Sequence, residues 1–447
     1  MAAPSPHFPS TAFDPLSAWD LLRDEIRQRQ ETGYDVADVA RRAETTDPHN
    51  REQVLLLVDE LASVQRSAEW QYVEPEGVEA IRSSLPTAPP VAEVEASTLS
   101  DKIHAAWLGR IAGCNLGKPV ELGDYWTSDH IKAYLQLAGA YPLRDYVPAL
   151  DPMPAGFELR ECWTETTLGN VNGSSRDDDI DYSILALHLL ETHGADLSPE
   201  HVADAWTALL PLRQVFTAER AAYINITNGL TGPDIANYRN PYREWIGAQI
   251  RGDVYGYVFP GDPWKAAELA FRDASLSHVA NGVYGEMWAA ALISAAFTSN
   301  DATEAIKVSL SVVPPGSRLA EAIHAVLQLH KDGLDWDQAL KQIQSLYGHY
   351  SWVHTVNNAA LVVAGLLWGE GDYTRSVGLT VMGGWDTDSN GATVGSVAGI
   401  LAGTAKLPSH LIDPLQDRVR SALFGFDNAR ISDLAERTFS LAVNGLK

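Results

Sequence analysis

The stretch GATVGSVAGILAG, residues 391–403, has a glycine at every fourth position, and GRIAGCNLG, residues 109–117, has the same spacing. Glycine lowers intrinsic helix stability by about 1 kcal/mol per residue, so neither stretch favours an isolated helix. Residues four apart lie on one face of a helix, and a face of glycines lets two backbones approach closely. The spacing therefore predicts two helices at the centre of a helical bundle.

The remainder of the chain has the pattern of an all-α protein, because apolar residues recur at helical spacing and strand-like alternation is weak. Helical patterns are clearest at 180–191, 199–209, 266–274, 287–297, 318–330 and 357–367. Residues 14–84 are also helix-like and lead into a Pro-rich, turn-like stretch, 83–97. We predict an N-terminal helical extension and linker over residues 1–98, and a main all-α domain over residues 99–447. A long turn-rich insert, residues 121–176, has the length of a functional loop or lid.

The composition excludes several classes of partner. The 447 residues include 33 Lys and Arg against 58 Asp and Glu, so the formal net charge is -25, which does not favour nucleic acid or anionic membranes. The two cysteines show neither a disulfide framework nor zinc-ligand spacing. The sequence lacks a secretory signal pattern and an apolar run of bilayer length. We expect a cytoplasmic protein that binds neither nucleic acid nor membrane, and its oligomeric state stays open.

The stretch SRDDDIDYS, residues 175–183, concentrates negative charge. Asp177, Asp178, Asp179 and Asp181 fall within five positions. One or two of them suit a helix N-terminus, but four exceed what capping uses. A hard divalent cation would offset their repulsion. The pattern is not an EF-hand loop, because Tyr182 stands where that loop needs glycine.

A second acidic group precedes the glycine-spaced stretch near the C-terminus. Asp386 and Asp388 are two positions apart, Ser389 follows, and Gly383 and Gly384 permit a tight bend before them. Taken alone, this group is also compatible with a solvated glycine-rich turn. Two acidic groups that each open a helix are what a two-metal site built from bundle helices requires.

Three motifs together resemble a known family. GRIAGCNLGKPVE (109–121), RDDDIDY (176–182) and GGWDTDSNGATVGSVAG (383–399) occur in the order found in the ADP-ribosylglycohydrolase family, which includes the dinitrogenase-reductase-activating glycohydrolases. The likeness extends over roughly residues 99–405. It implies an all-α helical bundle with two Mg²⁺ or Mn²⁺ ions in a central cleft. The ligands that it implies are Asp177, Asp178, Asp179, Asp386, Asp388 and Ser389.

The chain departs from the family pattern at several positions. Asp177 stands where the family usually has threonine and adds a negative charge. Trp385 separates the Gly-Gly pair from the first aspartate of the third motif, where many members have no residue. The Gly-Asn-Gly-x-x-Met-Arg stretch of the family is only loosely echoed around Asn281. These departures indicate a divergent bacterial branch.

The resemblance implies hydrolysis of an N- or O-glycosidic bond at C1 of a ribose, in an ADP-ribosyl or related nucleotide conjugate. Catalytic roles are expected for Glu121, Asp178 and Asp386. The choice of general base between Glu121 and an acid of the RDDDIDY motif stays open. Two alternatives remain, a hydrolase of a small nucleoside or nucleotide in specialised metabolism and a non-catalytic ADP-ribose-binding protein.

Five further residues are candidates for contact with the substrate. The backbone N–H groups of Gly383 and Gly384 could contact a diphosphate. Trp385 could stack on a base or a ribose, although an aromatic of the core or of a lid would look the same in sequence. Gly117 in the first motif and His278 complete the set, and His278 could equally be a structural histidine.

Overall fold

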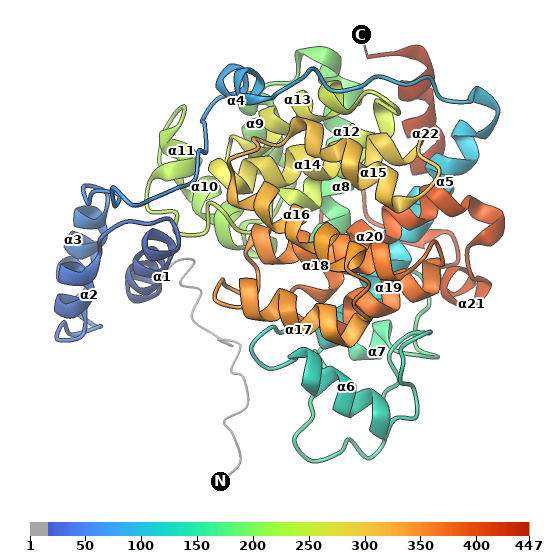
Figure 1. Ribbon diagram of the computed structural model, residues 1–447, viewed down its shortest axis with the longest axis horizontal. Helices are drawn as coiled ribbons and strands as arrows, with labels where there is room; N and C mark the ends of the chain where they lie inside the picture. The colour runs from blue at the N-terminus through green and yellow to red at the C-terminus, as the bar shows by residue number, and fades with distance from the viewer. Residues whose placement is uncertain (1–16, 447) are drawn as a thin grey trace.

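The computed structural model describes residues 17–446, and its secondary structure is mainly helical (Figure 1). The N-terminal helices are α1 (Ala18–Glu31), α2 (Ala37–Ala43), α3 (Arg51–Leu61) and α4 (Val78–Ser84). The bundle comprises α5 (Ala96–Gly117), α6 (Ser128–Leu137), α7 (Trp163–Thr166), α8 (Asp178–His193), α9 (Pro199–Leu209), α10 (Thr217–Thr227), α11 (Asp234–Asn237), α12 (Asp253–Val258), α13 (Pro263–Ala274), α14 (Ala280–Ala296), α15 (Ala302–Ser309), α16 (Arg318–Lys331), α17 (Trp336–Tyr347), α18 (Thr355–Trp368), α19 (Tyr373–Met382), α20 (Thr387–Ala402), α21 (Ser409–Ile412) and α22 (Ile431–Asn444).

Extended structure is slight by comparison. The strands β1 (Arg418–Val419) and β2 (Ala429–Arg430) pair antiparallel. Of the described residues, 62% are helical, and the prediction of an all-α protein is confirmed. None of the helices between residues 17 and 446 has both the length and the apolar character needed to cross a membrane.

Helices α5 and α20 form the centre of the bundle and pack antiparallel with their backbones in contact. A Cβ added at Gly113 would lie 2.1 Å from the carbonyl oxygen of Gly391, and one added at Gly109 would lie 2.2 Å from that of Gly395. Every residue of α20 from 387 to 400 is buried. The glycine spacing thus predicted both the helices and their central position. We call this backbone contact the α5–α20 seam.

The six segments with clear helical pattern all form helices, namely α8, α9, α13, α14, α16 and α18. The insert over residues 121–176 is less irregular than predicted, because it contains α6. Thr127 caps α6 by accepting a hydrogen bond from the His130 N–H, and Ile131 and Leu135 bury one face of the helix. Figure 1 shows α6 and α7 projecting from one end of the bundle.

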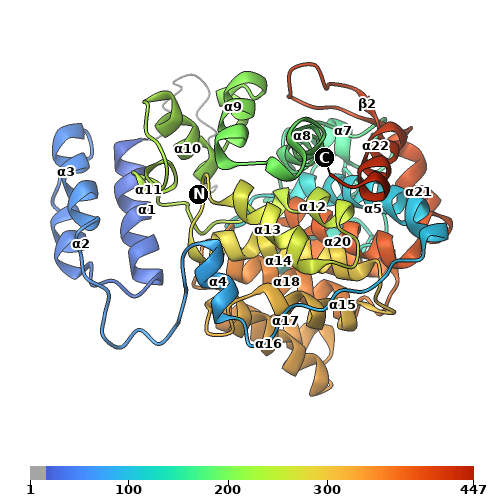
Figure 2. The ribbon, with the colours of Figure 1, turned by 90° about the horizontal axis from the view of Figure 1, so that it is seen from above.

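The N-terminal helices α1–α3 stand beside the bundle as a separate layer (Figures 1 and 2). They share a small hydrophobic core of their own, which includes Leu22, Val54 and Leu61. Helix α4, by contrast, contributes Ile81 to the large core of the bundle. Residues 1–16 of the predicted extension lie outside the described residues, and its boundary at residue 98 stays a prediction.

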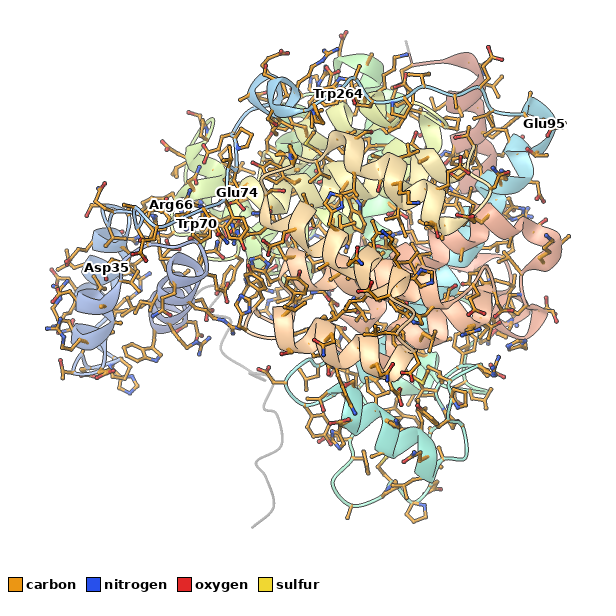
Figure 3. The ribbon with its side chains drawn as sticks, in the orientation of Figure 1. Asp35, Arg66, Trp70, Glu74, Glu95 and Trp264 are labelled. Carbon is orange, nitrogen blue, oxygen red and sulfur yellow. The ribbon has the colours of Figure 1, made fainter. Side chains whose placement is uncertain are left out.

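Buried ion pairs hold this layer against the bundle. Arg243 binds Glu25 of α1 through two hydrogen bonds of 2.6 and 3.0 Å. Arg318 at the start of α16 contacts Glu74, which lies between α3 and α4, at 2.8 Å and Glu244 of the bundle at 2.6 Å. Figure 3 shows Trp70 and Glu74 at this junction. Buried charged contacts therefore contribute to the attachment of the N-terminal segment to the bundle.

Arg318→Met tests this attachment. Because the Arg318, Glu74 and Glu244 side chains are at most 2% exposed, the substitution leaves two buried carboxylates without their cation. We expect the free energy of unfolding to fall by about 3–5 kcal/mol in chemical denaturation. The matched control is Arg375→Met, whose pair with Glu370 is exposed and should contribute less than about 1 kcal/mol. Equal effects of the two substitutions would contradict a buried attachment.

Candidate functional site

The three acidic motifs meet at one end of the α5–α20 seam. Asp386 is the N-cap residue of α20, and Asp177 is the N-cap residue of α8. Glu121 follows the 3-10 turn η1 (Lys118–Val120), which continues directly from α5. The Thr387 hydroxyl donates a 2.9 Å hydrogen bond to the carbonyl oxygen of Gly117, which ties the start of α20 to the end of α5. The seam therefore sets where the motifs meet.

The acidic side chains form two groups that touch. The first group is Glu121, Asp386 and Asp388, and the second is Cys114, Asp177 and Asp179. Within each group, one potential ligand atom of each residue lies within 4.8 Å of those of the other two. The Ser389 hydroxyl joins the groups, because it donates to Asp179 Oδ2 at 3.2 Å. The structure thus brings together predicted residues from all three motifs. Asp178, the half-buried first residue of α8, belongs to neither group, and its expected role stays a prediction.

Burial and mutual repulsion raise the pKa of most of these carboxyl groups. Burial and the neighbouring charge of Asp177 raise the pKa of Asp178 to about 7. The same two causes raise the pKa of Asp388, and raise that of Asp179 well above its ordinary value. For Asp386, burial and Asp388 raise the pKa well above the usual range. Added positive charge at this place would therefore be stabilising.

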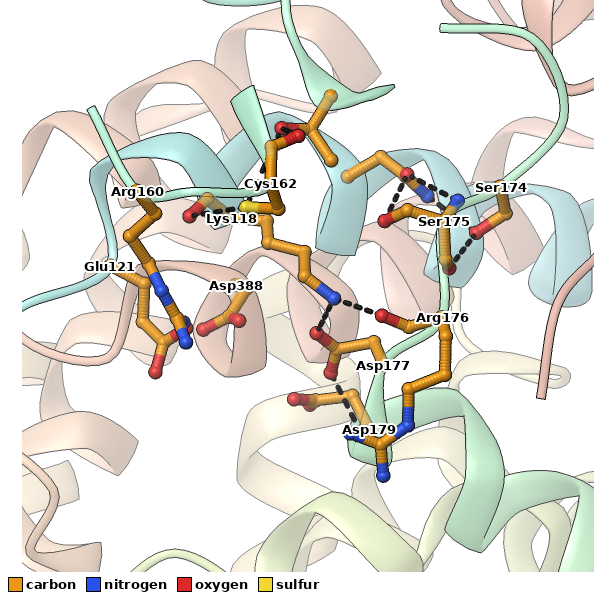
Figure 4. Close-up of polar contacts among 12 residues, drawn as sticks. Lys118, Glu121, Arg160, Cys162, Ser174, Ser175, Arg176, Asp177, Asp179 and Asp388 are labelled. Atoms are coloured by element: carbon orange, nitrogen blue, oxygen red, sulfur yellow. Dashed lines mark hydrogen bonds and ion pairs between the residues drawn. The ribbon is translucent and has the colours of Figure 1, made fainter. Parts of the chain in front are cut away.

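Cations of the chain already reach the cluster, and Figure 4 shows Lys118 and Arg160 among them. The Lys118 ammonium lies 2.5 Å from Asp177 Oδ2, and the Arg160 guanidinium pairs with Glu121. Although burial favours the neutral acid, Lys118 and Arg176 hold the pKa of Asp177 well below its ordinary value. Sequence reasoning missed both cations. The only signal for Lys118 was the extra carboxylate at position 177, since an added acid in a buried cluster calls for an added cation.

The remaining donors fit a hard divalent cation. The cluster offers carboxylate and hydroxyl oxygens, which Mg²⁺ and Mn²⁺ prefer. Within the described chain, the buried Asp179 Oδ1 accepts no hydrogen bond, and its nearest cation is Arg110, at 3.7 Å. The Cys114 thiol suits such an ion poorly, since burial and the nearby carboxylates raise its pKa and keep it neutral.

Asp181, the fourth aspartate of the RDDDIDY motif, does not face the cluster. It pairs with Arg176 at 2.8 Å and accepts hydrogen bonds from the Ser421 hydroxyl and the Ala422 N–H. The four-aspartate stretch therefore divides into a cluster-forming part and an aspartate that anchors the segment after β1.

The backbone N–H groups of Gly383 and Gly384, which are expected to contact a diphosphate, already donate hydrogen bonds within the protein. The Gly383 N–H donates to the carbonyl oxygen of Leu379, and the Gly384 N–H donates to that of Val381, so both close the end of α19. Contact of these two groups with a diphosphate stays a prediction that would require breaking those bonds. Gly117 lies in the seam, where an added Cβ would be 2.2 Å from the carbonyl oxygen of Thr387.

Trp385 and His278 occupy different surroundings. Trp385 has a φ of 59°, a left-handed value uncommon for a large side chain, and is half-buried directly before Asp386. The fully buried His278 lies beside Ser277, with its Nε2 4.0 Å from Glu219. It also borders an apolar cavity of about 580 Å³ between residues 75–81 and the helices α9, α10, α11, α13 and α14. The pKa of His278 is lowered well below its ordinary value by burial and Arg251, which favours a neutral, structural histidine.

The protein is therefore an all-α bundle in which buried carboxylates at the N-termini of α8 and α20 form a candidate cation site. The chain belongs to the ADP-ribosylglycohydrolase family, whose model matches residues 95–445. The family is generally metal-dependent, and the two acidic groups could hold metal ions.

Comparison with other proteins adds little beyond the family. A solved structure described as "ADP-ribosylglycohydrolase-related protein complex" is 18% identical, with 77% of this chain and 99% of that chain covered at a TM-score of 0.45. No curated protein matches the chain.

Proposed function

We propose that this protein is a divalent-metal-dependent glycohydrolase. Its substrate class is an ADP-ribosyl or related nucleotide conjugate, in which it hydrolyses the N- or O-glycosidic bond at ribose C1. The observation that carries the proposal is the convergence of Glu121, Asp386 and Asp388 with the α8 aspartates at the end of the seam. Family membership supports the glycohydrolase activity.

The residues divide into ion-holding and water-directing groups in this proposal. Asp386, Asp388 and Asp179 would hold the ion, with the Ser389 hydroxyl beside them. A divalent ion there would supply charge to bind ribose hydroxyls and to lower the pKa of water. Glu121 would accept a proton from that water, because its half-buried carboxylate lies beside Asp386 and Asp388 at the edge of the cluster.

A panel of conjugates tests the proposal. ADP-ribosylated protein, N-linked ADP-ribosyl-arginine and O-linked ADP-ribosyl-serine are incubated with the protein, and released ADP-ribose is measured by chromatography. We expect release with Mg²⁺ or Mn²⁺ from at least one conjugate, and a decrease of at least about 100-fold with EDTA. Release that EDTA leaves unchanged would contradict metal dependence. Binding of ADP-ribose without any release would instead favour the non-catalytic binding protein.

Glu121→Gln separates the two roles. The substitution keeps the size of the side chain but removes its capacity to accept a proton. We expect about a 100-fold or greater loss of turnover with divalent-ion affinity changed by less than about tenfold. Loss of ion binding together with turnover would instead make Glu121 a ligand.

A further inference from the structure

Lys118 and Asp177 form a closed ion pair inside the acidic cluster. The ammonium lies 2.5 Å from Asp177 Oδ2 and also donates to the carbonyl oxygen of Arg176. Both side chains are less than 10% exposed. The other carboxylate oxygen of Asp177 accepts a 3.0 Å hydrogen bond from the Asp179 N–H. Both oxygens of Asp177 are therefore engaged, which leaves it poorly placed to bind a metal ion.

The pair also depends on the acid at position 177. A threonine at position 177 would be neutral and could not hold a buried ammonium, whereas the aspartate that stands there does so. Figure 4 shows the Lys118 amine joined to Asp177 and to the backbone of Arg176 by hydrogen bonds. The added acid and the cation that neutralises it thus belong to one arrangement.

The second acidic group has no such buried pair. Its cation, Arg160, has a side chain that is 25% exposed and comes from the insert rather than from a central helix. Asp386 and Asp388 keep oxygens close to Glu121. Asp179 Oδ1 accepts no hydrogen bond from the described residues, and its nearest cation, Arg110, lies 3.7 Å away, farther than Lys118 lies from Asp177. Room for a divalent ion therefore lies on this side of the cluster.

We propose that the Lys118 ammonium takes the place of one of the two divalent ions, so that this chain binds a single ion at Asp386, Asp388 and Asp179. The inference rests on the proposed function, since it assumes a divalent-ion site. A second dication beside Asp177 would lie within a few ångström of the buried ammonium and would be strongly repelled. The positive charge of Lys118 then neutralises Asp177, as a metal ion at that position would otherwise do.

The number of bound ions tests the inference. The full chain is saturated with Mn²⁺, and the stoichiometry is measured by titration calorimetry and by elemental analysis after dialysis. We expect one Mn²⁺ per chain and the electron paramagnetic resonance spectrum of an isolated ion. The double variant Lys118→Met/Asp177→Thr removes the ammonium and places a hydroxyl at position 177. We expect it to bind two ions and to give the spectrum of a spin-coupled pair.

The matched control is Lys132→Met/Asp337→Thr, which removes an exposed Lys–Asp pair of 3.3 Å outside the cluster and should leave one ion bound. Two ions in the wild-type chain would overturn the inference whether or not the double variant folds, and would leave the proposed hydrolase intact. A folded double variant that still binds one ion would also overturn it. A wild-type chain that neither binds an ion nor hydrolyses any conjugate would overturn the proposed function itself.

Discussion

Asp388→Asn is expected to abolish hydrolysis while making the metal-free protein more stable. The substitution removes a carboxylate that the proposed ion needs, so we expect turnover to fall by at least about 100-fold and divalent-ion affinity to fall with it. In EDTA the same change relieves repulsion, because burial and Asp177 raise the pKa of Asp388 in the folded state. We expect the free energy of unfolding to rise by about 1–4 kcal/mol.

The stability gain should depend on pH in a defined direction. A carboxyl whose pKa is higher in the folded than in the unfolded state costs stability while it is charged, and the cost vanishes once both states are protonated. The difference between Asp388→Asn and wild type in EDTA should therefore be largest near about pH 8 and shrink as the pH approaches about 4. Asp332→Asn, at an exposed helix end, serves as the control. Loss of stability in Asp388→Asn would contradict the repulsion.

Gly113→Ala is expected to destabilise the protein severely although alanine is the better helix former. On intrinsic propensity alone the change would gain about 1 kcal/mol. In the seam, the new Cβ would lie 2.1 Å from the carbonyl oxygen of Gly391 and 2.7 Å from its carbonyl carbon, so the two backbones must separate. We expect a loss of about 3 kcal/mol or more in the free energy of unfolding, measured by chemical denaturation.

Gly139→Ala is the control for this substitution. Gly139 has a φ of 65°, and an added Cβ there would meet no atom of the described chain within 4 Å, so only backbone strain of about 1–2 kcal/mol is expected. Once Gly113→Ala has separated the helices, adding Gly391→Ala should cost much less than it does alone. Equal losses at positions 113 and 139 would show that backbone conformation, and not close packing, explains the glycines.

The fold and part of the site could be predicted because the relevant signals are local. Four-residue glycine spacing is a property of one helix, and it identified both α5 and α20. Aspartates at helix N-termini are also local, and the pairing of two such groups predicted that the acids of residues 177–179 and 386–388 share one site. Small helices such as α6 escaped prediction because one capping residue and two or three apolar side chains give a weak pattern within a polar insert.

The contacts that escaped prediction join residues far apart in the chain. Glu74 and Arg318 are 244 positions apart, and no feature near either residue indicates the other. The partner of Glu121 is an arginine in the insert, and the partner of Asp177 is a lysine that follows α5. In an acidic chain, which of the few cations reaches which acid depends on the packing of several helices. The engaged N–H groups of Gly383 and Gly384 likewise depend on where α19 ends.

In the α5–α20 seam, the register of the two helix backbones determines the distance between the acidic motifs, and the packing of side chains does not. The glycine contacts recur every four residues, so a slip by one interval would displace one helix along the other by about 6 Å. Such a slip would move the whole start of α20, and Asp386 with it, away from Glu121. A shift smaller than four residues would not restore the contacts between the glycines. Side chains at the end of the seam are free to change around this fixed frame. Asp177 could therefore be exchanged for threonine beside Lys118 while the seam keeps the positions of Glu121 and Asp386.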